Sequence, residues 1–429
     1  MIKTHDHMRY LVTILLVTAC AFQIAAQSSL TIEECYTLAE QNYPLVRQRD
    51  LIEKSRGYNI DNVLSGNLPQ IVINGQATYQ SDVTAVPIRV PGQEIKPLSK
   101  DQYKLYAEVS QTIYDGGLIR HQKGLEEISS DVASRQLEVE LYKLKERVNQ
   151  LFFGLLLTDE QIRQTQLLRK DIELGLRKAE AAVLNGTALK SDLNQLKAEL
   201  LKVEQRNVEL SAQRGAYLQM LGLFINRSLS ENTQLMKPES RPIPSEVTRP
   251  ELRLFDMQMS AIAARDNLIT ARNRPKVSLF VQGGVGRPAL NMLSNDLEGY
   301  YLGGIRLHWP ISSFYNRSRD RALAELDHQG VQLQKETFLF NTTLASNQVA
   351  ADVSKYASLL TTDDEIIALR DDIKKTAAVQ LEHGAITTTD YLREVNAEDQ
   401  ARLSKIVHEI QWLMAQYTLE TTNGTIYQN

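Results

Sequence analysis

The sequence predicts an α+β membrane protein in which four strands are combined with very long helices. Four segments alternate apolar and polar residues with a period of two, which is typical of half-buried strands and of barrel strands. Two stretches of about 70 residues contain no proline and predict rod-like helices. The same pattern of breakers occurs in both halves of the chain, which predicts an internal duplication.

Composition excludes several classes of protein. Of 429 residues, 43% are hydrophobic and 23% are charged, so the chain is neither disordered nor uniformly embedded in lipid. The formal net charge of −4 gives no reason to expect a nucleic-acid partner. The two cysteines, Cys20 and Cys35, exclude a disulfide framework and any cysteine-based zinc site.

The first 26 residues predict an export signal peptide. Lys3 and Arg9 precede an apolar run of about 16 residues, shorter than the roughly 20 that span a bilayer, and small residues end it. We expect cleavage near Ala26; lipid attachment at Cys20, in the sequence Val17-Thr18-Ala19-Cys20, is the alternative. Since no later apolar run could form a membrane-spanning helix, an exported chain is either periplasmic or inserted as a barrel.

Matching residues mark the duplication. The segment Asn67–Ile71 recurs as Asn273–Val277, and Pro44 recurs as Pro250 at the same spacing. The later matches have a slightly shorter spacing, because the first copy has the longer loop between its strands, Val83 to Lys100. We assign residues 1–26 to the signal, 27–222 to a first repeat, 223–247 to a linker, 248–422 to a second repeat and 423–429 to a tail.

Each repeat is expected to run helix, strand, strand, very long helix, tight turn, helix. The first repeat opens with Thr31-Ile32-Glu33-Glu34, a capping-box pattern that begins a helix. That helix is expected to continue towards Asn67, where Pro69 ends it.

The four predicted strands are unusually long. Each covers about 10 to 13 residues, against 5–6 in ordinary sheets and 9–11 for a strand that crosses a bilayer. Aromatic residues near their ends suit a membrane interface. The alternative is an amphipathic sheet packed on a layer of helices. The apolar rows are Ile71, Ile73, Ala77 and Tyr79; Tyr103, Leu105, Ala107 and Val109; Val277, Leu279, Val281 and Val285; and Tyr301, Ile305, Leu307 and Trp309.

Four strands cannot close a barrel, which requires about eight even when side chains fill it. A four-stranded sheet with an apolar outer face must therefore be completed by further copies of the chain. Three copies would supply about twelve strands around an open passage, whereas two would also close but would leave little lumen.

The two rods, Asp115 to Asn185 and Phe314 to His383, would each be roughly 105 Å long as helices. They are too polar for a bilayer and are expected to project into an aqueous space. Small and polar residues on their faces suit close helix packing around a hydrated bore; a plain coiled-coil spacer is the alternative. A heptad seam is formed by Leu137, Leu141, Leu144, Val148, Leu151, Leu155, Thr158, Ile162 and Thr165.

Both rods end in the same way. Asn185-Gly186 and His383-Gly384 predict left-handed caps that reverse the chain. Asp192 and Asp390 follow six residues after their glycines, about one turn into the returning helix. Each aspartate either complements the positive helix N-terminus or lines the far mouth of a tube.

With this layout, the chain resembles the TolC-like outer-membrane efflux protein family over essentially its whole mature length. The resemblance rests on the duplicated order of elements, on the segment Val109–Gly117 that leads from strand into rod, and on the two turns. It implies a homotrimer with a twelve-stranded β-barrel in the outer membrane, continued by a long α-helical barrel in the periplasm. It also implies a periplasmic adaptor and an inner-membrane pump, driven by protons or by ATP, as partners.

The resemblance also implies where the tube narrows. Ser191 and Asp192 match the entrance positions of the first copy, and Asp390 matches the first entrance aspartate of the second. Arg393 stands where better-known members have another aspartate, and Leu381 and Ile386 replace residues that help to lock the entrance. The turns at Asn185, Gly186, His383 and Gly384 are the expected adaptor contacts. Six carboxylates at one constriction would attract cations.

The sequence gives no sign of an enzyme or of a cofactor. His408-Glu409 begins like a zinc-helix motif, but Trp412 occupies the place of the second histidine. The expected function is a passive duct that exports small molecules or ions. Two alternatives are the outer-membrane channel of a one-step protein secretion system and a soluble periplasmic helical-hairpin spacer or adaptor.

Overall fold

A computed structural model describes residues 29–84, 97–242 and 246–424 of the chain. The expected signal peptide with Cys20, most of the loop between the first two strands and the end of the tail lie outside the described residues. The chain divides into two compact units, each drawing on both halves of the sequence. We call Met1–Val46, Val139–Arg249 and Leu339–Asn429 the helical unit, and Arg47–Glu138 and Pro250–Phe338 the sheet unit.

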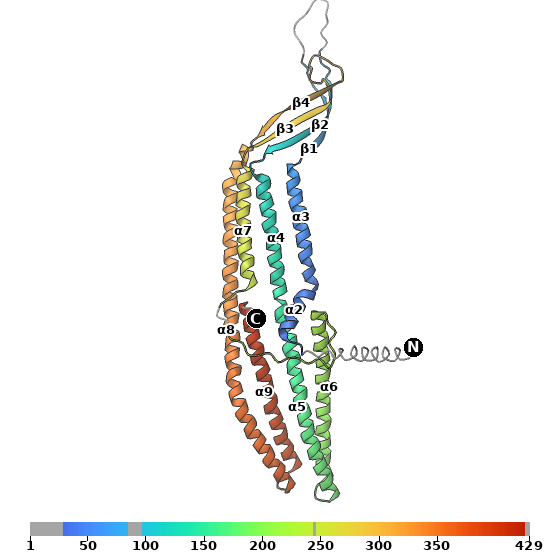
Figure 1. Cartoon of the computed structure of the whole chain (residues 1–429), viewed down its shortest axis with the longest axis vertical. Coiled ribbons are helices and arrows are strands. Elements are labelled where there is room, and N and C mark those ends of the chain that lie inside the picture. Colours follow the sequence, from blue (N-terminus) through green and yellow to red (C-terminus); the bar gives the residue numbers. More distant parts are fainter. Residues whose placement is uncertain (1–28, 85–96, 243–245, 425–429) are drawn as a thin grey trace, which may run out of the picture. The chain divides into compact units, whose positions relative to one another are not determined.

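The order of elements follows the prediction in both halves (Figure 1). In the first half, α2 (Ile32–Asn42) and α3 (Gln48–Leu64) lead into β1 (Gln70–Tyr79) and β2 (Asp101–Tyr114), followed by α4 (Leu118–Tyr142), α5 (Leu144–Leu184) and α6 (Lys190–Ile225). In the second, α7 (Pro250–Arg272) leads into β3 (Lys276–Arg287) and β4 (Glu298–His308), followed by α8 (Phe314–Glu382) and α9 (Thr388–Asn423).

The prediction of the first helix was wrong in one respect. Thr31 accepts a hydrogen bond from the Glu34 backbone N–H at 3.2 Å, so the helix begins as expected. It ends at Asn42, however, and Pro44 opens a short 3-10 turn before α3. The reason is physical: proline has no N–H to donate to the preceding turn, and its ring crowds the carbonyl four residues back.

The two rods differ in continuity. The second is a single helix, α8, of 69 residues, which corresponds to about 100 Å of helical rise. The first was expected to be unbroken but is interrupted at Lys143, between α4 and α5. No proline or glycine marks this break, so the sequence pattern carries no signal for it.

The core of the helical unit is built around α5. Seven of the nine residues of the heptad seam, which begins in α4 and continues along α5, are buried, with Val148 and Leu155 inaccessible to solvent. The other two, Leu151 and Ile162, are half-buried. A second cluster near the far end of α5 joins Ile172, Leu196 of α6 and Val395 of α9. The main cluster gathers side chains of α2, α5, α6 and α9: Leu30, Ile32, Cys35, Ala39, Val148, Phe152, Phe153, Leu155, Leu156, Leu218, Leu221, Ile225, Ile410, Leu413 and Tyr417.

The segment after α6 is fixed to this core by arginines. Arg214 pairs with Asp159 at 2.5 Å and donates to the carbonyl oxygens of Glu231 at 2.6 Å and Thr233 at 2.9 Å. Arg241 pairs with Glu420 and stacks over the ring of Tyr417. These contacts hold an irregular strip of chain against α5 and α9.

The sheet unit contains one antiparallel sheet with the strand order β1-β2-β3-β4. The strand β2 leads into α4 through Asp115, Gly116 and Gly117. Asp115 accepts backbone hydrogen bonds from Gly117 at 2.8 Å and Ile119 at 2.7 Å, which caps the helix. Gly116 has φ +72°, and a Cβ there would lie 2.6 Å from Cβ of Arg274, so both backbone and space require glycine.

Candidate functional site: the two faces of the sheet and the two helix turns

The register of the sheet gathers all four apolar rows on one face. Cross-strand partners share a face, and Ile71 pairs with Val109, which pairs with Val281. Leu279 pairs with Ile305 in the same way. Four rows predicted separately from alternation therefore merge into one continuous apolar surface, which we call the apolar face.

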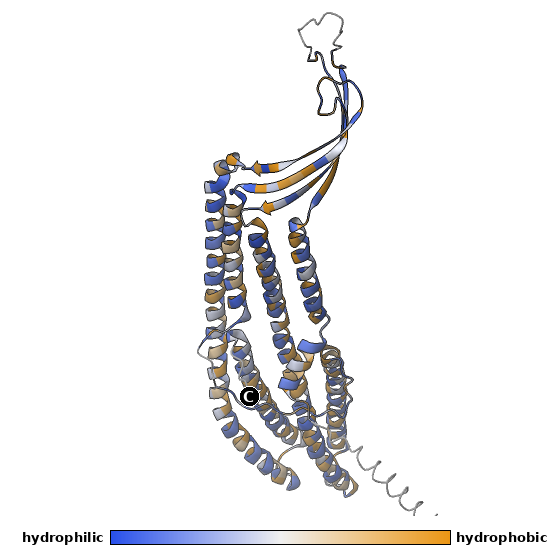
Figure 2. Ribbon diagram, turned by 45° about the horizontal axis from the view of Figure 1, so that its top comes forward, coloured by the Kyte–Doolittle hydropathy of each residue, from blue (hydrophilic) through white to orange (hydrophobic). Residues whose placement is uncertain are grey.

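The apolar face is uncovered in the single chain. Ile73 is 74% exposed and Ile305 is 73% exposed, values that are unusual for large aliphatic side chains gathered in one patch. Apolar and polar residues follow one another along each strand (Figure 2). A surface of this kind marks an interaction with a partner or with lipid.

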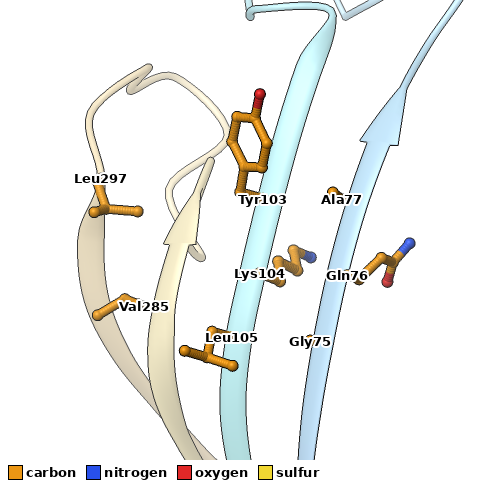
Figure 3. Close-up of a pocket in the computed structure, with 8 residues that line it drawn as sticks. All are labelled: Gly75, Gln76, Ala77, Tyr103, Lys104, Leu105, Val285 and Leu297. Atoms are coloured by element: carbon orange, nitrogen blue, oxygen red, sulfur yellow. The ribbon is translucent and has the colours of Figure 1, made fainter.

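One shallow groove of about 410 Å³ lies at the end of the sheet where β2 begins (Figure 3). Tyr103, Leu105 and Val285 line it from two neighbouring strands, and Leu297 contributes from the segment before β4. Gly75 leaves room beside Leu105, since a Cβ there would only touch the leucine at 3.6 Å. Most of the lining is apolar, and Lys104 and Gln76 contribute polar groups to it.

The opposite face of the sheet, which we call the polar face, holds a charged cluster across three strands. Arg306 of β4 donates to both carboxylate oxygens of Glu108 of β2, at 2.7 and 3.2 Å. Gln282 of β3 donates to the same carboxylate. The guanidinium lies over the ring of Phe280, 4.4 Å from its centroid. Glu108 and Arg306 both alternate with the apolar rows and therefore lie on the polar face, but their pairing depends on the order of the strands in the sheet.

The two turns of the helical unit have the predicted geometry. Gly186 and Gly384 both have φ +70°, the left-handed conformation expected of a residue just past a helix. Thr187 N–H bonds to the Ala182 carbonyl at 2.8 Å, and Ala385 N–H bonds to that of Gln380 at 2.8 Å. These bonds satisfy backbone carbonyl groups at the C-terminal ends of α5 and α8, beside Asn185 and His383. Each chain reversal is therefore held by backbone hydrogen bonds.

Asp192 and Asp390 occupy the same place in their helices. The Asp192 carboxylate accepts from the Leu189 backbone N–H at 3.1 Å, in the first turn of α6. The Asp390 carboxylate accepts from the Thr387 backbone N–H at 3.2 Å and from its hydroxyl at 2.7 Å, in the first turn of α9. Both carboxylates therefore complement a helix N-terminus, and both residues are half-buried.

The surroundings of the two aspartates differ. Hydrogen bonds from the hydroxyl and the backbone N–H of Thr387 lower the pKa of Asp390, with the positive charge of Arg393 contributing. Arg393 lies 3.7 Å from Asp390 and 3.1 Å from Glu394, so its charge is shared between two carboxylates. Ser191 is exposed next to Asp192. The structure thus places Arg393 against Asp390, whereas among the described residues no basic side chain forms an ion pair with Asp192.

Ion pairs join α8 to its neighbours in the helical unit. Lys374 bonds to Asp171 of α5 at 3.0 Å and to Glu398 of α9 at 3.2 Å. Burial disfavours the charged amine of Lys374, yet these two carboxylates outweigh it and raise the pKa of the lysine. His408 of α9 lies 2.7 Å from the buried carboxylate of Asp363. The sequence pattern did not reveal these pairs, because each joins residues that are far apart in the chain.

Over the described part of the chain, no group of three or more histidine, cysteine, aspartate or glutamate residues could hold a metal ion. Within the same residues, no helix combines the length and the apolarity that a membrane crossing demands.

Comparison with known proteins bears on the first half of the chain directly. Residues 35–225 match the model of a family described as Outer membrane efflux protein. This segment of the chain is similar to that family. No curated protein sequence matches the chain. The matched residues include the first strand pair, the first rod and the turn at Gly186.

Solved structures extend the likeness in fold to both halves. The CusC structure, described as forming a transmembrane channel, has a TM-score of 0.69 at 14% identity and covers 91% of each chain. The Campylobacter jejuni CmeC outer membrane channel gives 0.65 at 14% identity, covering 93% of this chain and 86% of its own. The open state of the Neisseria gonorrhoeae MtrE outer membrane channel gives 0.66 at 14%, with 92% and 88% covered.

The matching family is described by efflux and by the outer membrane, and the CmeC and MtrE structures are described as outer membrane channels. At 14% identity, the likeness of this chain to those structures is one of fold.

Proposed function

We propose that this chain is the passive outer-membrane exit duct of a tripartite efflux system, exporting small molecules or ions. In this proposal three copies pool their sheets into a twelve-stranded barrel, and their long helices continue it as a tube. A periplasmic adaptor and an inner-membrane pump supply the cargo. The repeated order of elements supports the internal duplication through which one chain provides two strand pairs and two rods.

The observation that carries the proposal is the one-sided sheet. Its apolar face is continuous across four strands, and its outer strands β1 and β4 each pair with a single neighbour in the chain. Unpaired backbone groups of an edge strand cannot be tolerated in hydrocarbon, where no water satisfies them. Pairing β4 of one copy with β1 of the next satisfies both edges and puts every apolar row on the outside.

The entrance is proposed to lie at the turns after Gly186 and Gly384. Asp192 and Asp390 of three copies would place six carboxylates there, and a ring of like charges attracts cations and repels anions. The turn residues Asn185, Gly186, His383 and Gly384 are proposed as the contact with the adaptor. Ser191 and Arg393 complete the entrance, with Arg393 withdrawing part of the charge of Asp390.

Planar-bilayer recording of the purified full-length protein tests this function. The expected result is discrete conductance steps with a preference for cations. A protein that is released from membranes by a salt wash alone, and that produces no steps, would remove both the barrel and the duct. The spacer or adaptor alternative predicts that second result.

A further inference from the structure

Glu108, Arg306, Gln282 and Phe280 form a cluster on the polar face. Arg306 lies in β4 and Glu108 in β2, so their two-pronged contact crosses the whole width of β3. Arg306 donates to both oxygens of the carboxylate, and Gln282 donates to one of the same two oxygens. Paired forks of this kind are the strongest and best-oriented ion pairs in proteins.

The guanidinium is held in a prepared position. Its central carbon lies over the ring of Phe280, 4.4 Å from the centroid, and Phe280 itself lies against Gly304. A Cβ at Gly304 would come within 3.2 Å of that ring, so glycine gives the aromatic ring its place. The Glu108 side chain is only 14% exposed, whereas that of Arg306 is 46% exposed. The pair is therefore fixed on one side and accessible on the other.

The pair lies in a part of the polar face that is otherwise uncharged. Along the polar face, charged side chains occur at the two ends of the strands, at Lys104 and Glu298 on one side and at Lys276 on the other. Between these levels, Glu108 and Arg306 are the only charged residues of the polar face in the four described strands. The middle of this face in the four strands is therefore otherwise uncharged.

We infer that the Glu108–Arg306 pair sets the charge selectivity of the barrel by keeping the middle of its lumen electrically neutral. This rests on the proposed function, in which the polar face lines the lumen. Three copies would contribute three carboxylates and three guanidinium groups at one level, and each pair cancels. The barrel then favours ions of neither sign, so cargo of either charge passes it. The cation preference of the whole channel comes from the carboxylates at the periplasmic turns.

A merely structural role would be that of a brace between β2 and β4. The two roles differ in the direction of the selectivity change. Loss of a brace should have the same effect whichever partner is removed, whereas loss of charge neutralisation should have opposite effects for the two partners. Removing the negative partner should leave a ring of three positive charges, and removing the positive partner a ring of three negative charges. Charged rings in a narrow lumen change local ion concentrations strongly, so we expect the permeability ratio of K⁺ to Cl⁻ to change by about twofold or more.

The test is the reversal potential of full-length channels in planar bilayers under a KCl gradient. Glu108→Gln should shift selectivity towards Cl⁻, and Arg306→Gln should shift it towards K⁺. The exchanged pair, with Glu108→Arg and Arg306→Glu together, should restore the wild-type ratio. Assembly of each variant is checked first by the mobility of its oligomer in detergent.

A second measurement covers variants that fail to assemble. Arg306→Cys channels are modified in place with a positively charged thiosulfonate, which should return the reversal potential to the wild-type value, and with a negatively charged one, which should move it further towards K⁺. Shifts of the same sign in both glutamine variants, or no shift in channels that conduct, would overturn the inference. Failure of the wild-type protein to conduct would instead refute the proposed function.

Discussion

The apolar face leads to a prediction with a matched control one residue away. Ile73 and Asn74 are neighbours in the middle of β1, on opposite faces, and pair with Ala107 and Tyr106 of β2. Arginine is introduced at each position in turn. Because Ile73 is 74% exposed in the single chain, Ile73→Arg in a protein surrounded by water should change the free energy of unfolding by only about 0.5 kcal/mol.

The result differs if the apolar face lies against hydrocarbon. Arginine on the lipid face near the middle of a bilayer costs about 2–4 kcal/mol per chain, which corresponds to roughly 30- to 1,000-fold in the folding equilibrium. Arginine at Asn74 would face the aqueous lumen, and the cost should stay within about 1 kcal/mol. The expected order of stability is therefore wild type, Asn74→Arg close behind, and Ile73→Arg far below.

The assay is urea unfolding of the protein inserted in lipid vesicles, followed by the shift in gel mobility between folded and unfolded forms. Insertion efficiency is measured with the same preparation. Equal stability and equal insertion of Ile73→Arg and Asn74→Arg would refute the reasoning, because the two faces would then see the same solvent.

Four further results are expected. Asp192→Ala combined with Asp390→Ala should weaken cation selectivity in single-channel recordings, and unchanged selectivity would remove these residues from the entrance. The pKa of Asp390 is lowered in the folded protein, so its capping contribution to stability is present above the unfolded pKa of about 3.9. That contribution is lost as the pH falls through the lower folded pKa. In acid titrations of helix content, wild type should show this loss and Asp390→Asn should not. Cys35 is buried, and burial raises its pKa to about 12, so it should resist alkylation until the protein unfolds; rapid labelling of the native protein would contradict the packing of α2. Phe153→Ala should lower the free energy of unfolding by about 3–5 kcal/mol, since the ring is buried against Phe152 and Tyr417, and chemical denaturation measures it.

Alternation was sufficient to predict the strands and their faces. Side chains of a strand point alternately to opposite sides, so Tyr103, Leu105 and Val109 had to share a face whatever the rest of the fold. Proline and glycine likewise predicted the chain reversals, since Gly186 and Gly384 adopt the backbone conformation that only glycine accepts without strain.

Features that depend on distant residues could not be predicted in this way. The contact between Glu108 and Arg306 joins residues that lie two strands apart, and it follows from the strand order. The pairing of Lys374 with Asp171 and Glu398 depends on how three helices pack. Local pattern indicates that such side chains are polar and exposed, but the partner is a property of the tertiary structure.

The position of the entrance stays a proposal because one chain explains its aspartates in two ways. Each carboxylate already accepts hydrogen bonds from a helix N-terminus, at Leu189 or Thr387, which is a complete local role. A role in the mouth of a tube requires other copies of the chain. The two roles are compatible, since both residues are only half-buried.

The number of chains in the membrane-extracted assembly tests the central claim most directly. The claim is that the apolar face is exposed to hydrocarbon and that separate copies close it into one wall. Native mass spectrometry of protein extracted with detergent should give three copies of the mature chain and no stable single copy. A single chain that stays in solution without detergent would contradict the account.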